Sequence, residues 1–546
     1  MNKSFWTRHY PQGVPDEITI SQDTIPDILQ KAVAQYPQAH AFTHEGRSLS
    51  FQELETLSRR WAAYLQSLDF LQAQDRILIQ IPNCLSFPVL VYGSIRAGMV
   101  VVASNPLYTK REIIRQLRDC QAKIWVTTAH HKSIMDEVQS ETDVEQIILS
   151  DIYDFHGFWQ RSLVKASLAW KFGSDKKPTV RYLSLRRALA RGRKQGFQPP
   201  AIQQDDLALL QYTGGSSGRF KGAQLHHRQV VANMEQLKAY LGDSIRPNQE
   251  TIVAPLPLYH IFSFTVHCLM AVSTGNHVIL VQDPTRTDRL VEIIKASNMT
   301  GFAGLNPLFH SLLRNATFKQ LSFKNLRLTI AGGMALSPDI ARQWQEVTRC
   351  PILEGFGMSE TSPVVTLNPP QAPKLGSIGL PLPNTEVRLV NEHNAVVTQA
   401  GETGELEVRG PQVMSGYWQQ PEETGQQLSS DGWLKTGDLA SFDQDGYLTI
   451  VGRKKRMIIV SGFNVYPQEV EEVLSLHPQV VSARVSGSMH RITGETIRAE
   501  VLARRPLPDS NDLRRFCREH LAPYKVPRTL TIVEVSSLPQ AAGDSH

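Results

Sequence analysis

The chain has 546 residues, a length that exceeds a single hydrophobic core and predicts at least two domains. Its 41% apolar and 20% charged residues exclude a disordered or fibrous protein, and a net charge of +5 is too small to indicate a nucleic-acid partner. Its five scattered cysteines include no CxxC pair, and the N-terminus has no apolar core segment. We therefore expect reduced thiols and a cytoplasmic protein.

Short β-branched runs alternate with longer amphipathic segments through much of the chain. Five runs read as buried strands: 75–81, 99–104, 123–128, 277–281 and 326–332. Because periodic helical segments separate them, we predict parallel α/β units.

The sequence changes character near residue 376, where short strands with turn signals replace the α/β pattern. A strand, a helix and shorter strands then follow residue 455. The predicted fold class is α/β. We predict an N-terminal domain at 1–454, made of α/β subdomains and a β-rich subdomain at about 376–454, and a small α+β domain at 455–546.

Two segments bear on membrane contact. Residues 155–177 mix five aromatic side chains with five Lys/Arg, a composition typical of an amphipathic helix on an anionic membrane. A solvated helix packed on the domain is the alternative. Residues 251–282 contain no Asp, Glu, Lys or Arg, but prolines and histidines interrupt them, so we expect a buried strand and helix and not a membrane span.

A glycine-rich loop stands out in residues 209–222, LLQYTGGSSGRFKG. Glycines let several backbone N–H groups point at one anion, and hydroxyls and a lysine add further donors. The candidate phosphate-binding residues are Thr213, Gly214, Gly215, Ser216, Ser217, Gly218 and Lys221. Two residues separate Gly218 from Lys221, so the loop is not a Walker A motif. A plain Gly/Ser hairpin remains the alternative.

This loop resembles the phosphate-binding signature of the adenylate-forming superfamily, which includes acyl-CoA synthetases, luciferases and peptide-synthetase adenylation domains. Three further segments resemble that family's motifs in order and spacing: EGFGMSET at 354–361, DGWLKTGD at 431–438 and GYLTIVGRKKRMIIVSGFNVYPQEVEE at 446–472. The likeness spans about residues 40–540. The stretches 105–113, 256–265, 410–418 and 454–467 make the chain most similar to bacterial long-chain fatty acyl-CoA synthetases.

The resemblance implies an AMP-forming acid–thiol ligase that uses ATP, Mg²⁺ and coenzyme A to activate a fatty acid. It implies that Phe356 stacks on adenine, Ser359 contacts the α-phosphate and Glu360 binds Mg²⁺. It places Asp438 on the ribose hydroxyls and Arg453 beside ribose and phosphate. The nucleotide-facing glycines would be Gly332, Gly333, Gly355 and Gly357. From the residues alone, a capping role for Ser359 and a turn role for Asp438 stay open.

The acyl and coenzyme A sites are also implied by the resemblance. His260 would steer the carboxylate, Phe264 would gate the lipid tunnel and Asn306 would lie against the acyl chain. A packing role for His260 remains equally open. Lys455 would be the pivot about which the C-terminal domain rotates, and Ser461, Gly462 and Phe463 would form the loop along pantetheine.

One departure from the family lies near the C-terminus, where a Gly-Lys pair supplies a lysine for adenylation. Here Gly543 is followed by Asp544, and Lys525 belongs to the separate YKVP turn. Losing such a cation costs roughly a hundred- to thousandfold in rate. We therefore expect ATP binding, weak adenylation and retained thioester formation.

Two other functions stay open: a degenerate acyl- or nucleotide-binding paralogue, and a ligase that loads a carrier protein. A homodimer and a location at the inner face of the membrane are also left open.

Overall fold

The computed structural model describes residues 4–157, 178–214, 220–454 and 457–534. The chain divides into two compact units. The first unit comprises Met1–Pro106, Leu117–Tyr212 and Gly222–Lys454. The second unit comprises Leu107–Gln116, Thr213–Lys221 and Lys455–His546.

A seven-stranded sheet has the order β7-β6-β5-β3-β4-β8-β9. Its strands are β3 (Arg76–Ile79), β4 (Val100–Ala103), β5 (Ile124–Thr127), β6 (Gln146–Leu149), β7 (Tyr182–Ser184), β8 (Leu207–Gly214) and β9 (Phe220–His226). The pairs from β7 to β8 are parallel. Parallel strands are buried on both faces, which explains their continuous Val, Ile and Leu runs.

A nine-stranded sheet has the order β16-β15-β14-β13-β12-β10-β11-β1-β2. Its strands are β1 (His40–His44), β2 (Arg47–Ser50), β10 (Thr251–Ala254), β11 (His277–Leu280), β12 (Gly301–Gly304), β13 (Leu328–Ala331), β14 (Ile352–Gly357), β15 (Val364–Leu367) and β16 (Leu380–Pro381). Pairing is parallel from β1 to β14 and antiparallel at both ends. The five strands predicted from β-branched runs are confirmed as β3, β4, β5, β11 and β13.

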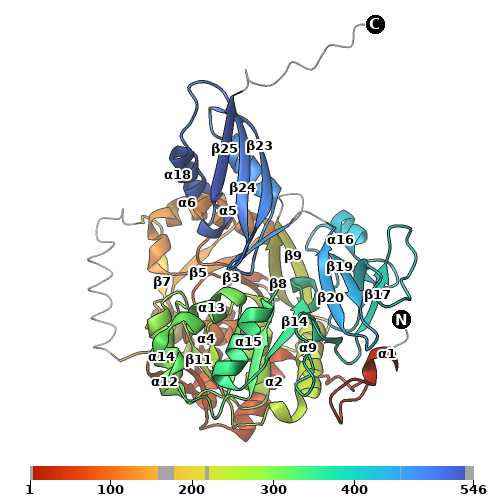
Figure 1. The fold of residues 1–546 in the computed structure, drawn as a ribbon. Helices are drawn as coiled ribbons and strands as arrows, with labels where there is room; N and C mark the ends of the chain where they lie inside the picture. Colours follow the sequence, from red (N-terminus) through yellow and green to blue (C-terminus); the bar gives the residue numbers. More distant parts are fainter. Residues whose placement is uncertain (1–3, 158–177, 215–219, 455–456, 535–546) are drawn as a thin grey trace. The chain divides into compact units, whose positions relative to one another are not determined.

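Helices connect these strands and cover the sheets (Figure 1). They are α1 (Ser4–Thr7), α2 (Ile25–Gln35), α3 (Phe51–Gln66), α4 (Ser86–Arg96), α5 (Lys110–Cys120), η1 (Ala129–Ile134), α6 (Met135–Glu141), α8 (Leu185–Gly192), α9 (His227–Leu241), η2 (Gly242–Ser244), α12 (Thr287–Ser297), α13 (Asn306–Arg314), α14 (Ala316–Lys319) and α15 (Pro338–Thr348). Helix α3 illustrates their local sequence logic. Ser50 accepts from the Glu53 N–H while Glu53 bonds back to Ser50, a capping box that fixes the first turn.

The uncharged segment 251–282 folds as expected into a buried strand, a helical run and a second strand. After β10 come α10 (Ile261–Ser263), a π-helix η3 (Phe264–Met270), α11 (Ala271–Ser273) and β11. All seven residues of η3 are buried. Within the described residues, no helix is both long enough and apolar enough to span a bilayer.

A four-stranded antiparallel sheet completes the first unit, and Figure 1 shows it in teal and light blue at one side of that unit. Its strands run in the order β17 (Glu386–Val390), β18 (Gly404–Arg409), β19 (Leu434–Phe442) and β20 (Leu448–Arg453). The short helix α16 (Pro421–Gln427) also belongs to this part of the chain, whereas η4 (Ser359–Thr361) lies between β14 and β15 of the nine-stranded sheet. A β-rich region after residue 376 is therefore present.

The second unit contains a five-stranded sheet and two longer helices. They are β21 (Ile458–Val460), β22 (Phe463–Val465), α17 (Pro467–Ser475), β23 (Val480–His490), β24 (Gly494–Ala503), α18 (Ser510–His520), η5 (Pro523–Lys525) and β25 (Thr529–Glu534). The strand order is β22-β21-β24-β23, with β25 parallel to β24. Apolar side chains of α17, such as Val470 and Leu474, pack into this unit's own core.

Candidate active site

The glycine-rich loop connects β8 to β9. Thr213 and Gly214 end β8, whereas Gly215, Ser216, Ser217 and Gly218 lie outside the described residues. Lys221 lies in β9 and is only 4% exposed. A lysine is rarely buried to this extent without a partner, so its ammonium group belongs to a polar environment and not to the open surface.

Glu360 is held in place by a residue from another motif. The hydroxyl of Tyr417 donates to Glu360 Oε1 at 2.7 Å, and the N–H of Met414 donates to the Glu360 carbonyl at 2.8 Å. Tyr417 in turn pairs with Ala223 in β9, and Trp418 N–H donates to Gly222 O at 2.8 Å. The carboxylate is 6% exposed. The segment 410–418 therefore positions the predicted metal ligand, a role that the sequence did not indicate.

The stretch Gly355–Ser359 is half-buried and lies at the end of β14. Glycine is required at two of its positions for packing. A Cβ at Gly355 would lie 2.9 Å from Thr366 O, and one at Gly357 would lie 2.0 Å from Pro363 O. These glycines let β14 pair closely with β15 on one side, which leaves the partly exposed ring of Phe356 at the same strand end.

Glu354, the first residue of the same motif, is a candidate that the sequence analysis missed. Its Oε1 accepts from Leu336 N–H at 3.1 Å, and the residue is 8% exposed. Burial raises the pKa of Glu354 from 4.5 to about 7, although the Leu336 hydrogen bond opposes this shift. A carboxyl with such a pKa next to the predicted nucleotide site is a functional candidate.

The glycine turn at Gly332 and Gly333 follows β13, as the sequence predicted. Gly333 has φ +79°, a conformation that side chains rarely adopt. A Cβ at Gly332 would touch the Phe262 ring at 3.5 Å and Gly355 O at 3.6 Å. The turn, β14 and the segment after His260 therefore meet at one place in the first unit.

Asp438 and Arg453 are brought together by antiparallel pairing of β19 and β20, in which they stand directly opposite. Arg453 Nε lies 2.8 Å from Asp438 Oδ1. Burial raises the pKa of Asp438, and the Arg453 guanidinium opposes this rise. The sequence predicted both residues separately, and the register places them as one charged pair.

His260 caps the helical run that contains Phe264. Its Nδ1 accepts from Phe262 N–H at 3.3 Å, so the ring proton of the neutral imidazole lies on Nε2. Burial lowers the pKa of His260 to about 4, which keeps the ring neutral at physiological pH. Phe264 is 4% exposed and begins the apolar helix η3.

Asn306 begins α13, and its Oδ1 accepts from Ser337 N–H at 2.9 Å. This bond ties α13 to the start of α15, close in sequence to the glycine turn. The structure thus gives Asn306 a positioning contact, in addition to the acyl contact that the sequence predicts.

In the second unit, the predicted pantetheine loop is a tight β-hairpin. Ser461 (φ +52°) and Gly462 (φ +85°) link β21 to β22 and both have left-handed backbones, as in a type I′ turn. Phe463 begins β22, and its ring stacks on Tyr524 with centroids 4.5 Å apart. The proposed pivot, Lys455, lies outside the described residues.

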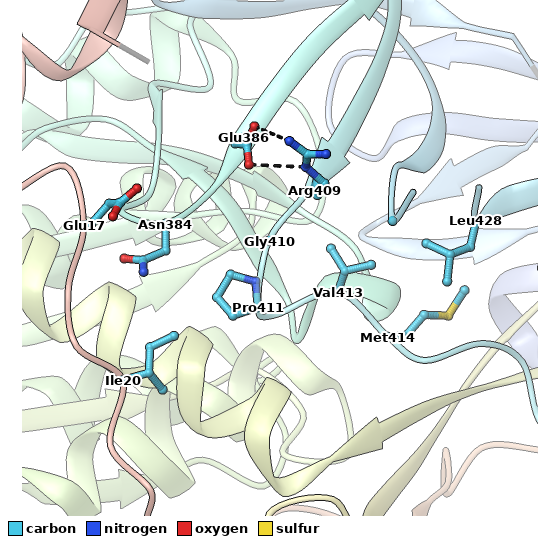
Figure 2. Close-up of a pocket in the computed structure, with 11 residues that line it drawn as sticks. Glu17, Ile20, Asn384, Glu386, Arg409, Gly410, Pro411, Val413, Met414 and Leu428 are labelled. Carbon is cyan, nitrogen blue, oxygen red and sulfur yellow. Dashed lines mark hydrogen bonds and ion pairs between the residues drawn. The ribbon is translucent and has the colours of Figure 1, made fainter. Parts of the chain in front are cut away.

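A pocket of about 480 Å³ lies elsewhere on the first unit and contains none of the predicted site residues. Figure 2 shows its lining, with the Glu386–Arg409 ion pair on one side and Pro411, Val413 and Met414 below it. Met414 also bonds to the Glu360 carbonyl, so this pocket is adjacent to the segment that positions Glu360.

Comparisons with known proteins agree with these motifs. Residues 29–418 match the family described as AMP-binding enzyme, and residues 469–542 match the AMP-binding enzyme C-terminal domain. The long-chain-fatty-acid–CoA ligase of Salmonella typhimurium is 39% identical over 540 residues, covering 97% of this chain and 95% of the relative. The ligase of the same name from Escherichia coli O157:H7 is 40% identical over 534 residues, covering 96% and 94%.

The fold also matches a solved structure. A double mutant of o-succinylbenzoate CoA synthetase from Bacillus subtilis, bound with a product analogue, has a TM-score of 0.78 and 25% identity. The match covers 95% of this chain and 96% of that one. From its motifs, its fold and these matches, the chain belongs to the AMP-binding enzyme family.

Proposed function

We propose that this protein activates a long-chain fatty acid with ATP through an acyl-adenylate and passes the acyl group to coenzyme A. The observation that carries the proposal is the neutral His260, which caps α10 just ahead of the fully buried and mostly apolar helix η3. A ligand with a polar head and an apolar tail needs these two features side by side. The names of the two relatives, long-chain-fatty-acid–CoA ligases, support this choice of substrate.

His260 orients the acid. Because Nδ1 is occupied by the Phe262 N–H, the N–H at Nε2 is the group that donates to a carboxylate oxygen. A neutral donor leaves the carboxylate nucleophilic, whereas an imidazolium would neutralise its charge. The low pKa of His260 therefore favours attack of the acid on the α-phosphate.

Groups of the first unit would bind the ribose, the adenine and the Mg²⁺ of ATP, whereas the candidate phosphate-binding loop, Thr213–Lys221, belongs to the second unit. Asp438, oriented by Arg453, accepts from the ribose hydroxyls, and Phe356 offers a face for adenine. Glu360, fixed by Tyr417, is the single protein carboxylate that would hold Mg²⁺, an ion that commonly takes one or two carboxylates and fills its other positions with phosphate and water. Bound Mg²⁺ would neutralise phosphate charge.

The second unit supplies the hairpin of Ser461, Gly462 and Phe463, along which the pantetheine of coenzyme A passes. The thiolate then attacks the acyl carbonyl and AMP leaves. A carrier protein presents the same pantetheine arm, so the mass of the product distinguishes coenzyme A from a carrier protein as the acceptor.

We infer that adenylation is the slow half-reaction, because the sequence has Asp544 after Gly543 where the resemblance implies a lysine; both residues lie outside the described part of the chain. An anion near the reacting phosphate opposes the developing charge. Asp544→Lys is expected to raise acid-dependent release of pyrophosphate, and an unchanged rate would remove this explanation.

The test of the function is pyrophosphate release from ATP with a series of acids. Long-chain fatty acids are expected to stimulate release above the acid-free rate, and acetate is the matched control without an apolar tail. Equal stimulation by acetate would contradict the fatty-acid assignment, and no stimulation by any acid would favour the degenerate binding protein.

Membrane contact through residues 155–177 is a separate proposal, which the basic and aromatic composition of that segment supports. Residues 158–177 lie outside the described part of the chain. Sedimentation with anionic vesicles, compared with neutral vesicles, tests it.

A further inference from the structure

Lys525 is a buried cation with two carboxylate partners. Its Nζ donates to Glu112 Oε1 and to Glu469 Oε1, each at 2.7 Å, and the residue is 3% exposed. The rings of Tyr108 and Phe220 lie 5.1 and 5.7 Å from the same nitrogen. All five residues belong to the second unit. We call this group the Lys525 cluster.

The two carboxylates of the cluster are themselves fixed at the starts of helices. Glu112 uses its other oxygen, Oε2, to accept from the N–H and the hydroxyl of Thr109, both at 2.8 Å. Glu469 stands in the first turn of α17, where Pro467 is the first helical residue. Lys525 therefore joins the N-terminal turns of α5 and α17, the ends at which carboxylates are favoured by the helix dipole.

The residue before Lys525 reaches the coenzyme A hairpin. Tyr524 stacks on Phe463, with ring centroids 4.5 Å apart and planes inclined by 22°. Phe463 follows the Ser461–Gly462 turn directly, and α17 begins four residues later. Tyr524 and Lys525, two adjacent residues of η5, therefore contact the two ends of the segment from the hairpin to α17. Tyr524 contacts Phe463, and Lys525 contacts Glu469.

This arrangement also excludes another role for Lys525. A lysine that replaced the missing adenylation lysine would need its charge available to phosphate. Here two carboxylates take that charge, and removing either partner of a buried pair leaves an uncompensated charge at considerable cost. The nearby carboxylates also keep the pKa of Lys525 well above its usual value, against the effect of burial.

We propose that Lys525 is a positioning residue for thioester formation. Together with Tyr524, it fixes the hairpin of Ile458–Val465 and the first turn of α17 against the start of α5, so that the hairpin is ordered before coenzyme A arrives. The inference depends on the proposed function, in which this hairpin guides pantetheine.

The experiment separates the two half-reactions in Lys525→Met, which keeps the length of the side chain and removes its charge. Thioester formation from a supplied acyl-adenylate and coenzyme A is expected to fall about a hundredfold, as for a reacting group displaced by a short distance. Acid-dependent ATP–pyrophosphate exchange is expected to stay unchanged. Equal loss in both half-reactions, or no loss in either, would overturn the proposal.

A matched control is Arg96→Met in the first unit. Arg96 is also 3% exposed and pairs with Glu55 at 2.6 Å, but it has no link to the hairpin. This variant is expected to lower thermal stability without changing the ratio of the two half-reactions. If Arg96→Met changes the ratio of the two half-reactions as much as Lys525→Met does, the loss of any buried ion pair has this effect and the proposal is overturned.

A second variant addresses the case in which Lys525→Met folds poorly. A readout other than activity addresses the case in which the natural chain is inactive. Tyr524→Leu removes the stacking on Phe463 and keeps the ion pairs of Lys525 with Glu112 and Glu469, and it is expected to lower thioester formation in the same way. Amide hydrogen exchange of residues 458–465 is expected to become faster in Lys525→Met. If the natural chain forms no thioester at all, the proposed function fails. Unchanged amide hydrogen exchange of residues 458–465 in Lys525→Met would overturn the positioning role independently of that result.

Discussion

Asp438 and Arg453 show how a single strand register brings together two residues of the proposed nucleotide site. They stand opposite each other on β19 and β20, and the side chain of Asp438 is 9% exposed. A hydrogen bond to a charged group contributes about 1.5–3 kcal/mol, so its loss weakens binding by roughly ten- to a hundredfold. Asp438→Asn is therefore expected to raise the KM for ATP by that factor, measured in pyrophosphate release.

The matched control is Asp431→Asn, at the start of the same motif. Asp431 is exposed and accepts from Ser429 Oγ at 2.6 Å in a surface turn. This variant is expected to keep the KM of the natural chain. If both variants have the same KM for ATP, Asp438 does not contact the nucleotide.

Glu354 gives the protein a predictable dependence of stability on pH. Its folded-state pKa of about 7 lies above the ordinary 4.5, so the folded state holds the proton more tightly. As pH rises from 4.5 to 7, the unfolded state ionises first. The contribution of this group to the free energy of unfolding therefore falls in that window, by about 3 kcal/mol, and is constant above it.

Glu354→Gln removes this titration and keeps an oxygen for the Leu336 N–H. The variant is expected to unfold at a higher urea concentration than the natural chain at pH 8, and the gap is expected to shrink toward pH 4.5. A gap of the same size at both pH values would contradict the raised pKa.

At the scale of elements, η3 follows the helical turn capped by His260, the proposed acid-binding residue, and is buried in the first unit. A cavity of about 20 Å³ lies beside it, lined by Val266 and Met270 of η3 and by Ala303 and Ile330 of the neighbouring strands. Strand β12 runs from this cavity toward Asn306, and β13 runs toward Gly332. The cavity therefore marks the inner end of the elements that carry the predicted acyl site.

Ala303→Val is expected to narrow this space and to shift specificity toward shorter acids. A methylene in an apolar pocket changes discrimination by at least about tenfold, so kcat/KM for long-chain acids should fall by that factor relative to medium-chain acids. Ala188→Val in α8 is the control, since Ala188 is also buried and does not line the cavity. If both variants give the same ratio of kcat/KM for long-chain over medium-chain acids, the cavity does not select the chain length of the acid.

Local sequence patterns predicted those parts of the fold that depend on local chemistry. The β-branched runs gave the parallel strands, and the turn signals after residue 376 gave the antiparallel sheet. The π-helix η3 could not be predicted, because it is a short buried run, polar only at Thr265 and His267, in which no periodicity distinguishes the wider turn. The sequence predicts a loop at Ser461–Gly462, and the structure shows a two-residue hairpin turn there, in which both residues have positive φ.

The same limit applies to the site. The motifs predict Asp438, Arg453 and Glu360 as site residues. The bond from Tyr417 to Glu360 spans 57 positions, and the Lys525–Glu112 bond spans 413, so no local pattern reveals either contact. The raised pKa of Glu354 depends on burial, which also arises only in the folded chain.

At the scale of the molecule, the proposed site residues are distributed over both units. The first unit contains Glu360, Asp438 and His260, and the second contains the candidate phosphate-binding loop Thr213–Lys221, the hairpin and the Lys525 cluster. We assign the hairpin and the Lys525 cluster to coenzyme A. We therefore predict that the thioester half-reaction remains effective even where adenylation is slow.

The most direct test measures acyl-CoA by mass spectrometry from two starting points, a long-chain fatty acid with ATP and Mg²⁺, and the corresponding acyl-adenylate, each with coenzyme A. The account predicts the acyl-CoA product from both, with faster formation from the adenylate. Formation of acyl-CoA from neither starting point would contradict the central claim that this chain is a fatty acyl-CoA synthetase.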